Sequence, residues 1–162
     1  MNADPAVMEH FPKVLTPAES LEMMRRLDRA IERNGYGFWA VQIIHSGELA
    51  GFVGLQQVTD PALDFAPAIE VGWRLDRRFW GQGIASEAAA AAIGFAFTEL
   101  GAEELLAYTA ARNERSQALM RRLGMRRDEA DDFLHPSIEP DDPIAPHVLY
   151  RIERSAWETR AT

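Results

Sequence analysis

The chain has 162 residues, of which 47% are hydrophobic and 26% charged; this is the composition of one folded domain and excludes a disordered chain. The formal net charge of −8 argues against a nucleic acid or an anionic membrane as partner and favours cationic partners, amines among them. The absence of cysteine excludes disulfides, thiolate metal sites and a cysteine nucleophile. No leader-like start or membrane-length apolar run is present, so we expect a cytoplasmic protein.

The first predicted element is a helix that begins after Thr16. The sequence Thr16-Pro17-Ala18-Glu19 supplies a threonine N-cap, a proline at the first helical position and a glutamate that reaches back to the cap. Met24, Leu27 and Ile31 then recur at helical spacing, and Asn34-Gly35 ends the run.

Strands and two further helices follow in an order that predicts a mixed α/β fold. A glycine turn at 45–48 joins two strands as a hairpin, and a later strand–helix–strand unit brings helices to both faces of the sheet. The predicted strands are Phe38–Ile44, Leu49–Val58, Ala68–Leu75, Leu105–Ala111, one from Met125 onward and His147–Ile152; the helices are Gly83–Leu100 and Asn113–Leu123.

The loop Arg78-Phe79-Trp80-Gly81-Gln82-Gly83 joins the third strand to the second helix. Its two glycines allow a sharp turn with exposed N–H groups, and the helix dipole behind them makes an anion site. The same residues also suit a plain strand-to-helix turn. The phosphate-binding Walker pattern and the dinucleotide fingerprint both fail, because the residues that they require after the glycines are absent.

Two motifs in the correct order resemble the GNAT superfamily of N-acetyltransferases, in particular its Rim-type branch, which acetylates ribosomal-protein N-termini. The first is Arg-x-x-Gly-x-Gly at 78–83, preceded by the strand Glu70–Leu75. The second is Asn113-x-x-Ser116, followed by a helix and Leu123-Gly124-Met125. The resemblance extends in element order from about residue 5 to residue 153.

The resemblance implies a mostly antiparallel central sheet that splays into a V, with helices on both faces. The family's first strand is apparently absent, because Met1–Pro5 resembles the family's first helix; either the start is truncated or the strand is lacking. Its loss would leave the strand Phe38–Ile44 with an unpaired edge, a place for self-association as a homodimer.

The family's co-substrate is acetyl-CoA, whose pantetheine arm pairs with the strand at the V and whose pyrophosphate lies on the glycine loop. Gly72 fits a strand position where another chain approaches closely. The cofactor-binding residues implied by the resemblance are Trp73, Arg74, Leu75, Arg78, Trp80, Gly81, Gln82, Gly83, Ile84, Ala85 and Asn113, with the side chains of Arg77 and Arg78 near phosphate.

Glu70 and Ser116 are the catalytic candidates. Alternation along the strand puts Glu70 on the face opposite Trp73, where its carboxylate is the candidate general base; the alternative is a glutamate paired with Arg74. Many relatives carry a proton-donating tyrosine at the position of Met120. Because methionine cannot donate, the resemblance assigns protonation of the thiolate to Ser116, the alternative being a serine bonded to its own helix. Asn113 also suits the N-cap of that helix.

The acceptor side is assigned to the segment between the last two strands and to the first strand. Residues 128–146 hold seven acidic residues, four prolines and no lysine or arginine, so they form either a negative rim that concentrates a cationic amine or a solvated loop. Substrate-binding candidates are Trp39, Glu70, His135 and His147. Trp39 also suits the core, and no defensible metal-ligand spacing is present, so we expect no metal.

The sequence therefore predicts one acetyltransferase domain over residues 1–162. We expect it to transfer an acetyl group from acetyl-CoA directly to a primary amine of a protein N-terminus or a small molecule. Transfer of a different acyl group, and an acyl-CoA sensor without turnover, are the alternatives.

Overall fold

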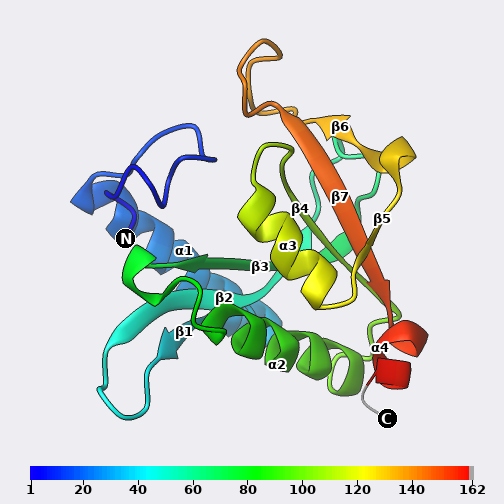
Figure 1. The fold of residues 1–162 in the computed structure, drawn as a ribbon, viewed down its shortest axis with the longest axis horizontal. Helices are drawn as coiled ribbons and strands as arrows, with labels where there is room; N and C mark the ends of the chain where they lie inside the picture. The colour runs from blue at the N-terminus through cyan, green and yellow to red at the C-terminus, as the bar shows by residue number, and fades with distance from the viewer. Residues whose placement is uncertain (161–162) are drawn as a thin grey trace.

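The computed structural model describes residues 1–160, which form one seven-stranded sheet with helices on both faces (Figure 1). This confirms the predicted mixed α/β class. The helices are α1 (Pro17–Asn34), α2 (Ile84–Thr98), α3 (Glu114–Arg122) and α4 (Arg154–Arg160). The strands are β1 (Phe38–Gln42), β2 (Leu49–Val58), β3 (Ala68–Leu75), β4 (Glu104–Ala110), β5 (Arg126–Arg127), β6 (Phe133–Leu134) and β7 (Pro146–Glu153), and short 3-10 turns are η1 (Arg77–Phe79) and η2 (Glu129–Asp131).

The strand order is β1-β2-β3-β4-β7-β5, and β6 pairs with β7. All pairings are antiparallel except the one between β3 and β4, which agrees with the mostly antiparallel sheet that we expected. Within residues 1–160, β1 forms one edge of the sheet. Among residues 1–160, no helix is long and apolar enough to cross a membrane.

Helix α1 is set by its own sequence at both ends. The Thr16 side chain accepts the Glu19 N–H, and the Glu19 carboxylate accepts the Thr16 N–H at 2.8 Å, which completes the capping box. Gly35 ends the helix in the left-handed region with a φ of 77°. Local chemistry therefore explains the bounds of this helix without reference to the rest of the fold.

The sheet opens between β3 and β4, as the resemblance predicts. β2 and β3 pair over eight consecutive residue pairs, whereas β3 and β4 pair only at Glu70 and Leu106. Beyond Glu70 the two strands diverge, so one side of the β3 main chain from Val71 to Leu75 has no strand partner. The main-chain groups around Trp73 that face this opening are a template for another extended chain, whereas the Leu75 carbonyl already accepts the Trp80 indole N–H.

The two faces of the sheet carry different helices. In Figure 1, α2 and α3 lie in front of the sheet and α1 lies behind it. Phe38 reaches from β1 across Gly54 to β3 on the α1 face, where a side chain at Gly72 would approach the Phe38 ring to 2.9 Å. Gly72 thus makes room for an aromatic ring of the protein itself, rather than for the cofactor as the sequence suggested.

The N-terminal segment, residues 1–15, consists of turns that pack against the start of the glycine loop and the α1 face. Asp4 forms an ion pair with Arg77 at 3.7 Å, and Phe11 lies 4.0 Å from the Arg74 guanidinium. The resemblance of Met1–Pro5 to a helix is not realised, because these residues adopt turns.

Candidate active site

A cleft of about 1270 Å³ occupies the opening between β3 and β4. Both faces of β3 contribute to it, since Glu70 faces α1 and Trp73 faces α3. Its other walls come from the N-terminal segment, α1, β2, β4, the glycine loop, α3 and the segment that precedes β7. The cleft therefore passes through the plane of the sheet and can receive one molecule from each face.

The glycine loop presents a run of free backbone donors at the start of α2. Gly81 and Gly83 are both left-handed, with φ of 71° and 82°. Gly83 is the N-cap and supplies no side chain, and within the described residues the six N–H groups from Gly81 to Ser86 have no acceptor. Four of these donors, from Gly83 to Ser86, are the N–H groups that any helix start leaves unpaired, and the left-handed turn at Gly81 and Gly83 adds those of Gly81 and Gln82. Unpaired donors at a helix N-terminus form an anion site of the kind that a pyrophosphate needs.

This cradle differs from the predicted one at its beginning. The N–H groups of Arg78 and Trp80 are not free, because they donate to Asp76 Oδ1 at 3.0 Å and to the Arg77 carbonyl at 3.2 Å. The Arg78 guanidinium binds Asp76 and Glu48, each at 3.2 Å, and lies outside the cleft. The N–H groups of Arg78 and Trp80 are therefore not free donors, the N–H of Ser86 is free instead, and a phosphate contact of the Arg78 side chain remains a prediction.

The indole of Trp80 closes the cradle on the side of α3. Its Nε1–H donates to the Leu75 carbonyl at 2.9 Å, and the Arg115 guanidinium lies 4.5 Å from its ring centroid. Arg115 therefore brings a positive charge from α3 to the donors of α2. Gln82 contributes its N–H only, since its side chain donates to the Arg78 carbonyl at 2.7 Å.

The main chain of β3 offers alternate residues to the opening. Asp76 donates its N–H to Ala50 of β2, and residues two apart along a strand point to the same side. The main-chain N–H and C=O groups of Arg74 therefore point toward β2, whereas those of Trp73 and Leu75 point toward the opening. The predicted pantetheine contacts of Trp73 and Leu75 remain predictions, and that of the Arg74 main chain is wrong.

The Arg74 side chain instead holds the α1 face together. Its Nη1 donates to Asn2 Oδ1 at 3.1 Å, and its guanidinium lies on the ring of Phe11. Burial lowers the pKa of Arg74 to about 10, and its Nε has no partner among the described residues. Arg74 does not pair with Glu70, so the salt-bridge interpretation of Glu70 is also wrong.

Ser116 sits at the centre of a hydrogen-bond network on the α3 side of the opening. Its Oγ accepts from Trp73 Nε1 at 3.3 Å and from Asn113 Nδ2 at 3.1 Å. Asn113 is the N-cap of α3, since its Oδ1 accepts the Ser116 N–H, and its amide also donates to Thr109. The Ser116 hydroxyl donates to none of the described residues, so its proton is available to a molecule in the cleft.

Glu70 lies on the opposite face, with its carboxylate near the Tyr108 hydroxyl of β4. Burial raises the pKa of Glu70 to about 8, and the Tyr108 hydroxyl opposes this by stabilising the carboxylate. Burial and the neighbouring Glu70 raise the pKa of Tyr108, which keeps its proton. A carboxylate that ionises near neutral pH is suited to accept a proton from an amine.

The two histidines predicted on the acceptor side lie beside Tyr108. The ring centroids of His135 and His147 are 4.9 Å apart, and both are about 6 Å from that of Tyr108 (6.2 and 6.1 Å). Burial lowers the pKa of both imidazoles, so they are neutral. His135 Nδ1 accepts the Ser137 N–H, which leaves Nε2–H as a donor. Contact with the acceptor remains a prediction for both.

The acidic segment 128–146 does not form a negative rim on the cleft. It contributes only His135, Ser137 and Ile138 to the lining. Its carboxylates serve its own folding: Asp131 and Asp132 bind Arg151 and Arg127, and Asp128 and Asp142 cap local turns. Within residues 1–160 no group of His, Asp and Glu side chains could hold a metal ion.

Trp39 lies on the other face of the sheet from Glu70. Its ring packs edge-on against Phe95 of α2 at 5.4 Å, outside the cleft. The predicted acceptor contact of Trp39 is therefore wrong, and its place is the core.

Sequence reasoning missed Tyr108 and Arg115. Tyr108 reaches Glu70 only because β3 and β4 are adjacent and parallel with Glu70 opposite Leu106, two residues before Tyr108. The available signal was a tyrosine on the inward face of a strand, where its hydroxyl needs a partner. Arg115 lies two residues after Asn113 in the recognised motif, but its contact with Trp80 depends on the packing of α3 against the loop.

A run of unpaired N–H groups at the start of α2, an opened sheet and a half-buried carboxylate are the features that a CoA-dependent acyltransferase site requires. The family model "Acetyltransferase (GNAT) domain" matches residues 1–126, and the chain belongs to this family. GNAT acetyltransferases use acetyl-CoA as co-substrate, so the predicted family and co-substrate are both confirmed.

Three proteins similar to this chain differ in their named acceptors. An FsC-acetyl coenzyme A-N(2)-transacetylase of Aspergillus fumigatus is 30% identical over 97% of this chain and 68% of its own length. The structural alignment with the ribosomal-protein-S5-alanine acetyltransferase of Vibrio fischeri (20% identical, TM-score 0.67) covers 88% of this chain and 74% of that protein. The alignment with the spermidine N-acetyltransferase of Vibrio cholerae in complex with CoA and spermine (16% identical, TM-score 0.73) covers 97% of this chain and 88% of that protein. The fold alone therefore does not specify the acceptor.

Proposed function

We propose that this protein transfers an acetyl group from acetyl-CoA directly to a primary amine, either a protein N-terminus or a small molecule. The observation that carries the proposal is the placement of Glu70 and Ser116 on opposite faces of the opened β3 strand. Glu70 faces α1, while Ser116, bonded to Trp73, faces α3. An amine that enters from the α1 face and a thioester that enters from the α3 face meet in the gap between β3 and β4.

Each step then has a group of this chain to perform it. The N–H groups from Gly81 to Ser86 hold the pyrophosphate, and the open side of β3 orients the arm that carries the thioester. Glu70 takes the proton of the amine, directly or through one water, as the new C–N bond forms. An N–H directed from β3 into the opening can stabilise the charge on the carbonyl oxygen. Ser116 gives its hydroxyl proton to the leaving sulfur as the C–S bond breaks; solvent then returns a proton to the Ser116 oxygen, and Glu70 releases the amine proton to solvent.

Release of CoA thiol against a panel of amines tests this proposal. We expect thiol release that depends on the amine and an N-acetylated product identified by mass spectrometry. Tight binding of CoA without release for any amine would instead support an acyl-CoA sensor. Propionyl-CoA and succinyl-CoA in the same assay test whether a different acyl group is preferred.

Replacement of Ser116 by alanine is expected to lower kcat by about 10²-fold, the low end for loss of a general acid. The affinity for CoA should stay near native, because the cradle and β3 are unchanged. Thr109→Val is a matched control, since it removes the other acceptor of the Asn113 amide and leaves the Ser116 hydroxyl in place. Stopped-flow single-turnover rates check the prediction. Equal rates for Ser116→Ala and the native protein would remove Ser116 as the acid.

The remaining sequence-based expectations are kept as proposals. One acetyltransferase domain over residues 1–162 is supported by a single sheet that extends from β1 to β7, although residues 161–162 lie outside the described residues. A homodimer that pairs the β1 edges is supported by the place of β1 in the strand order and is tested by the mass in solution. The cytoplasmic location also stays a proposal.

A further inference from the structure

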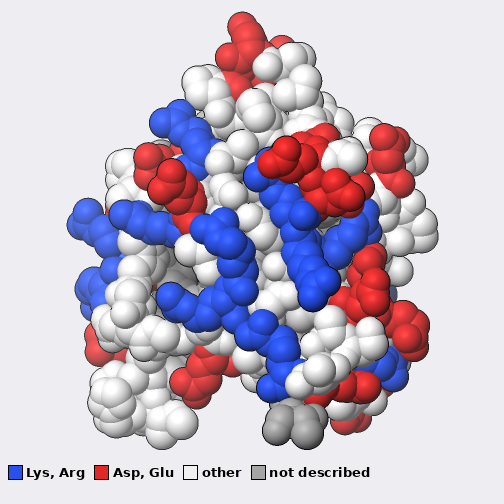
Figure 2. Space-filling view, turned by 45° about the vertical axis from the view of Figure 1, so that its right-hand side comes forward, with Lys and Arg blue, Asp and Glu red and all other residues white. Residues whose placement is uncertain are grey.

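The charges that line the cleft are almost all positive. Among the described residues Glu70 is the single carboxylate of the lining, against five arginines: Arg26, Arg33, Arg74, Arg115 and Arg122. The whole chain carries a net charge of −8, so the cleft has the opposite sign from the molecule. On the face drawn in Figure 2, basic side chains form a band across the middle and many acidic ones lie toward the top and sides.

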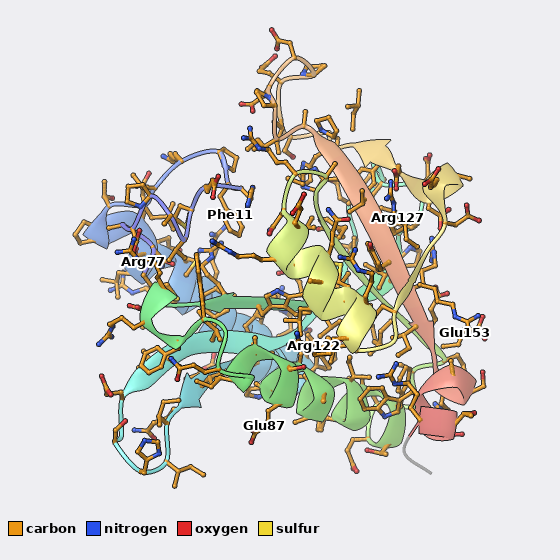
Figure 3. All side chains as sticks on the ribbon, in the orientation of Figure 1. Phe11, Arg77, Glu87, Arg122, Arg127 and Glu153 are labelled. Carbon is orange, nitrogen blue, oxygen red and sulfur yellow. The ribbon has the colours of Figure 1, made fainter. Side chains whose placement is uncertain are left out.

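Two of these arginines belong to the cofactor side. Arg115 lies over Trp80 beside the cradle, and Arg122 lies where α3 approaches α2 (Figure 3). Their charges suit the phosphates of CoA. Arg26 and Arg33 project from α1, on the same face of the sheet as Glu70. Because CoA phosphates at the start of α2 would lie on the other face, they would not neutralise these two arginines.

Helix α1 presents one continuous face to the cleft. The residues of this face are Met23, Arg26, Leu27, Ala30, Arg33 and Asn34. Their spacing of three and four residues is that of a single helical stripe, so two guanidinium groups flank an apolar strip about 10 Å apart along the axis. A positive charge in the last turn stabilises a helix wherever it points, but this does not explain why Arg33 faces the cleft.

Arg26 and Arg33 are free to bind a ligand. Both are exposed, and neither forms an ion pair with a described residue, whereas Arg29 of the same helix binds Glu22 at 2.9 Å. Arg74 already contacts Asn2 and Phe11, so it adds positive charge to this face, but its guanidinium is not free for a bidentate contact with a ligand. Unpaired guanidinium groups at a cleft wall recognise carboxylates and phosphates.

We propose that the acceptor is an amine that also carries an anionic group, a carboxylate or a phosphate. Arg26 and Arg33 bind this group while the amine lies beside Glu70. The inference rests on the proposed acetyl transfer and narrows its acceptor. It also disfavours polyamines, because a polycation would set like charges against these arginines.

Matched acceptors test the proposal. Each ω-amino acid is compared with the alkylamine of the same length and with the corresponding aminoalkyl phosphonate, and spermidine is the cationic probe. We expect kcat/KM to be about 10- to 100-fold higher for the anionic member of each pair, the range of a charge-assisted contact. The preferred member, carboxylate or phosphonate, identifies the group.

The double variant Arg26→Ala/Arg33→Ala should reduce this preference to near unity without a change in KM for acetyl-CoA. Arg25→Ala is the matched control, since Arg25 lies on the same helix, is exposed and is outside the cleft. Arg33→Glu should move the preference toward spermidine. Equal kcat/KM for both members of a pair in the native protein would overturn the proposal. So would a double variant that raises KM for acetyl-CoA, because the arginines would then belong to the cofactor.

A separate measurement distinguishes failure of this inference from failure of the proposed function. If no amine releases thiol, acetyl transfer is refuted, and calorimetry with N-acetyl ω-amino acids on the CoA-bound protein decides the anion site. Binding to the native protein that is lost in the double variant supports it. Absence of binding to the native protein refutes it.

Discussion

Replacement of Glu70 by glutamine is expected to lower kcat by about 10²- to 10⁴-fold, the usual contribution of a general base. Glutamine has almost the same shape and cannot accept the proton of the amine. CoA affinity should be near native, because the cradle lies at the start of α2. Glu87→Gln is a suitable control, since Glu87 is exposed on the first turn of α2 and lies outside the cleft (Figure 3).

The pH dependence of native kcat/KM should show the ionisation of Glu70. With an acceptor amine that stays neutral over the whole range, activity should rise with pH to a plateau above about 8, the pKa that burial gives Glu70. Tyr108→Phe removes the hydroxyl that stabilises the carboxylate, so the rising limb should move to higher pH. Tyr150→Phe is the control, because Tyr150 bonds Gln117 and Arg121 instead. If kcat/KM of Glu70→Gln still rises with pH in the same way, Glu70 is not the general base.

Stability should respond in the opposite direction from activity. The pKa of Glu70 is raised in the folded state from its ordinary 4.5 to about 8, so between these values the folded state binds more protons than the unfolded state. Its contribution to the free energy of unfolding is fully present at low pH and is lost as pH rises through about 8. Glu70→Gln should not show this loss, because glutamine does not ionise. Thermal melts across the pH range should show the Tm of the variant rising relative to that of the native protein as the pH increases.

Replacement of Gly83 by valine is expected to abolish measurable CoA binding. Gly83 has a φ of 82° with open space around it, so the cost of valine arises from the left-handed backbone and not from a clash. A backbone that leaves this conformation turns the N–H groups from Gly81 to Ser86 away from one another. Calorimetric titration with CoA gives the affinity.

Gly94→Val provides the comparison for that variant. Gly94 lies within α2, also with open space around it and with an ordinary helical φ, so the same side chain should leave CoA affinity unchanged. Native-like affinity in Gly83→Val would refute the cradle, and equal loss in both variants would indicate that valine disturbs α2 itself.

Features that depend on neighbouring residues were predictable from the sequence. The capping box of Thr16 and Glu19, the N-cap role of Asn113 and the left-handed turn at Gly81 and Gly83 each involve groups a few residues apart. The opening between β3 and β4 came from the family resemblance, because the pairing of two strands separated by α2 is not encoded in either strand alone.

Features that depend on distant contacts were not predictable. The sequence does not show that the β1–β2 hairpin brings Glu48 to the Arg78 guanidinium. Trp39 suited both the acceptor site and the core, because the sequence does not show which face of the sheet α2 covers. The charge count of residues 128–146 was misleading because none of its carboxylates lines the cleft, and two of them, Asp131 and Asp132, pair with Arg151 and Arg127 outside the segment.

The Phe38 ring closes the cleft on the acceptor side, and it comes from β1 rather than from β3, the strand that carries Glu70. β3 supplies the carboxylate, while a residue of the edge strand, two strands away, fills the space above Gly72. A smaller side chain at position 38 would deepen the cleft without any change in β3, β4 or the cradle. Substitutions in β1 alone can therefore change the size of the acceptor that related proteins accept, while the residues for proton transfer and cofactor binding stay the same.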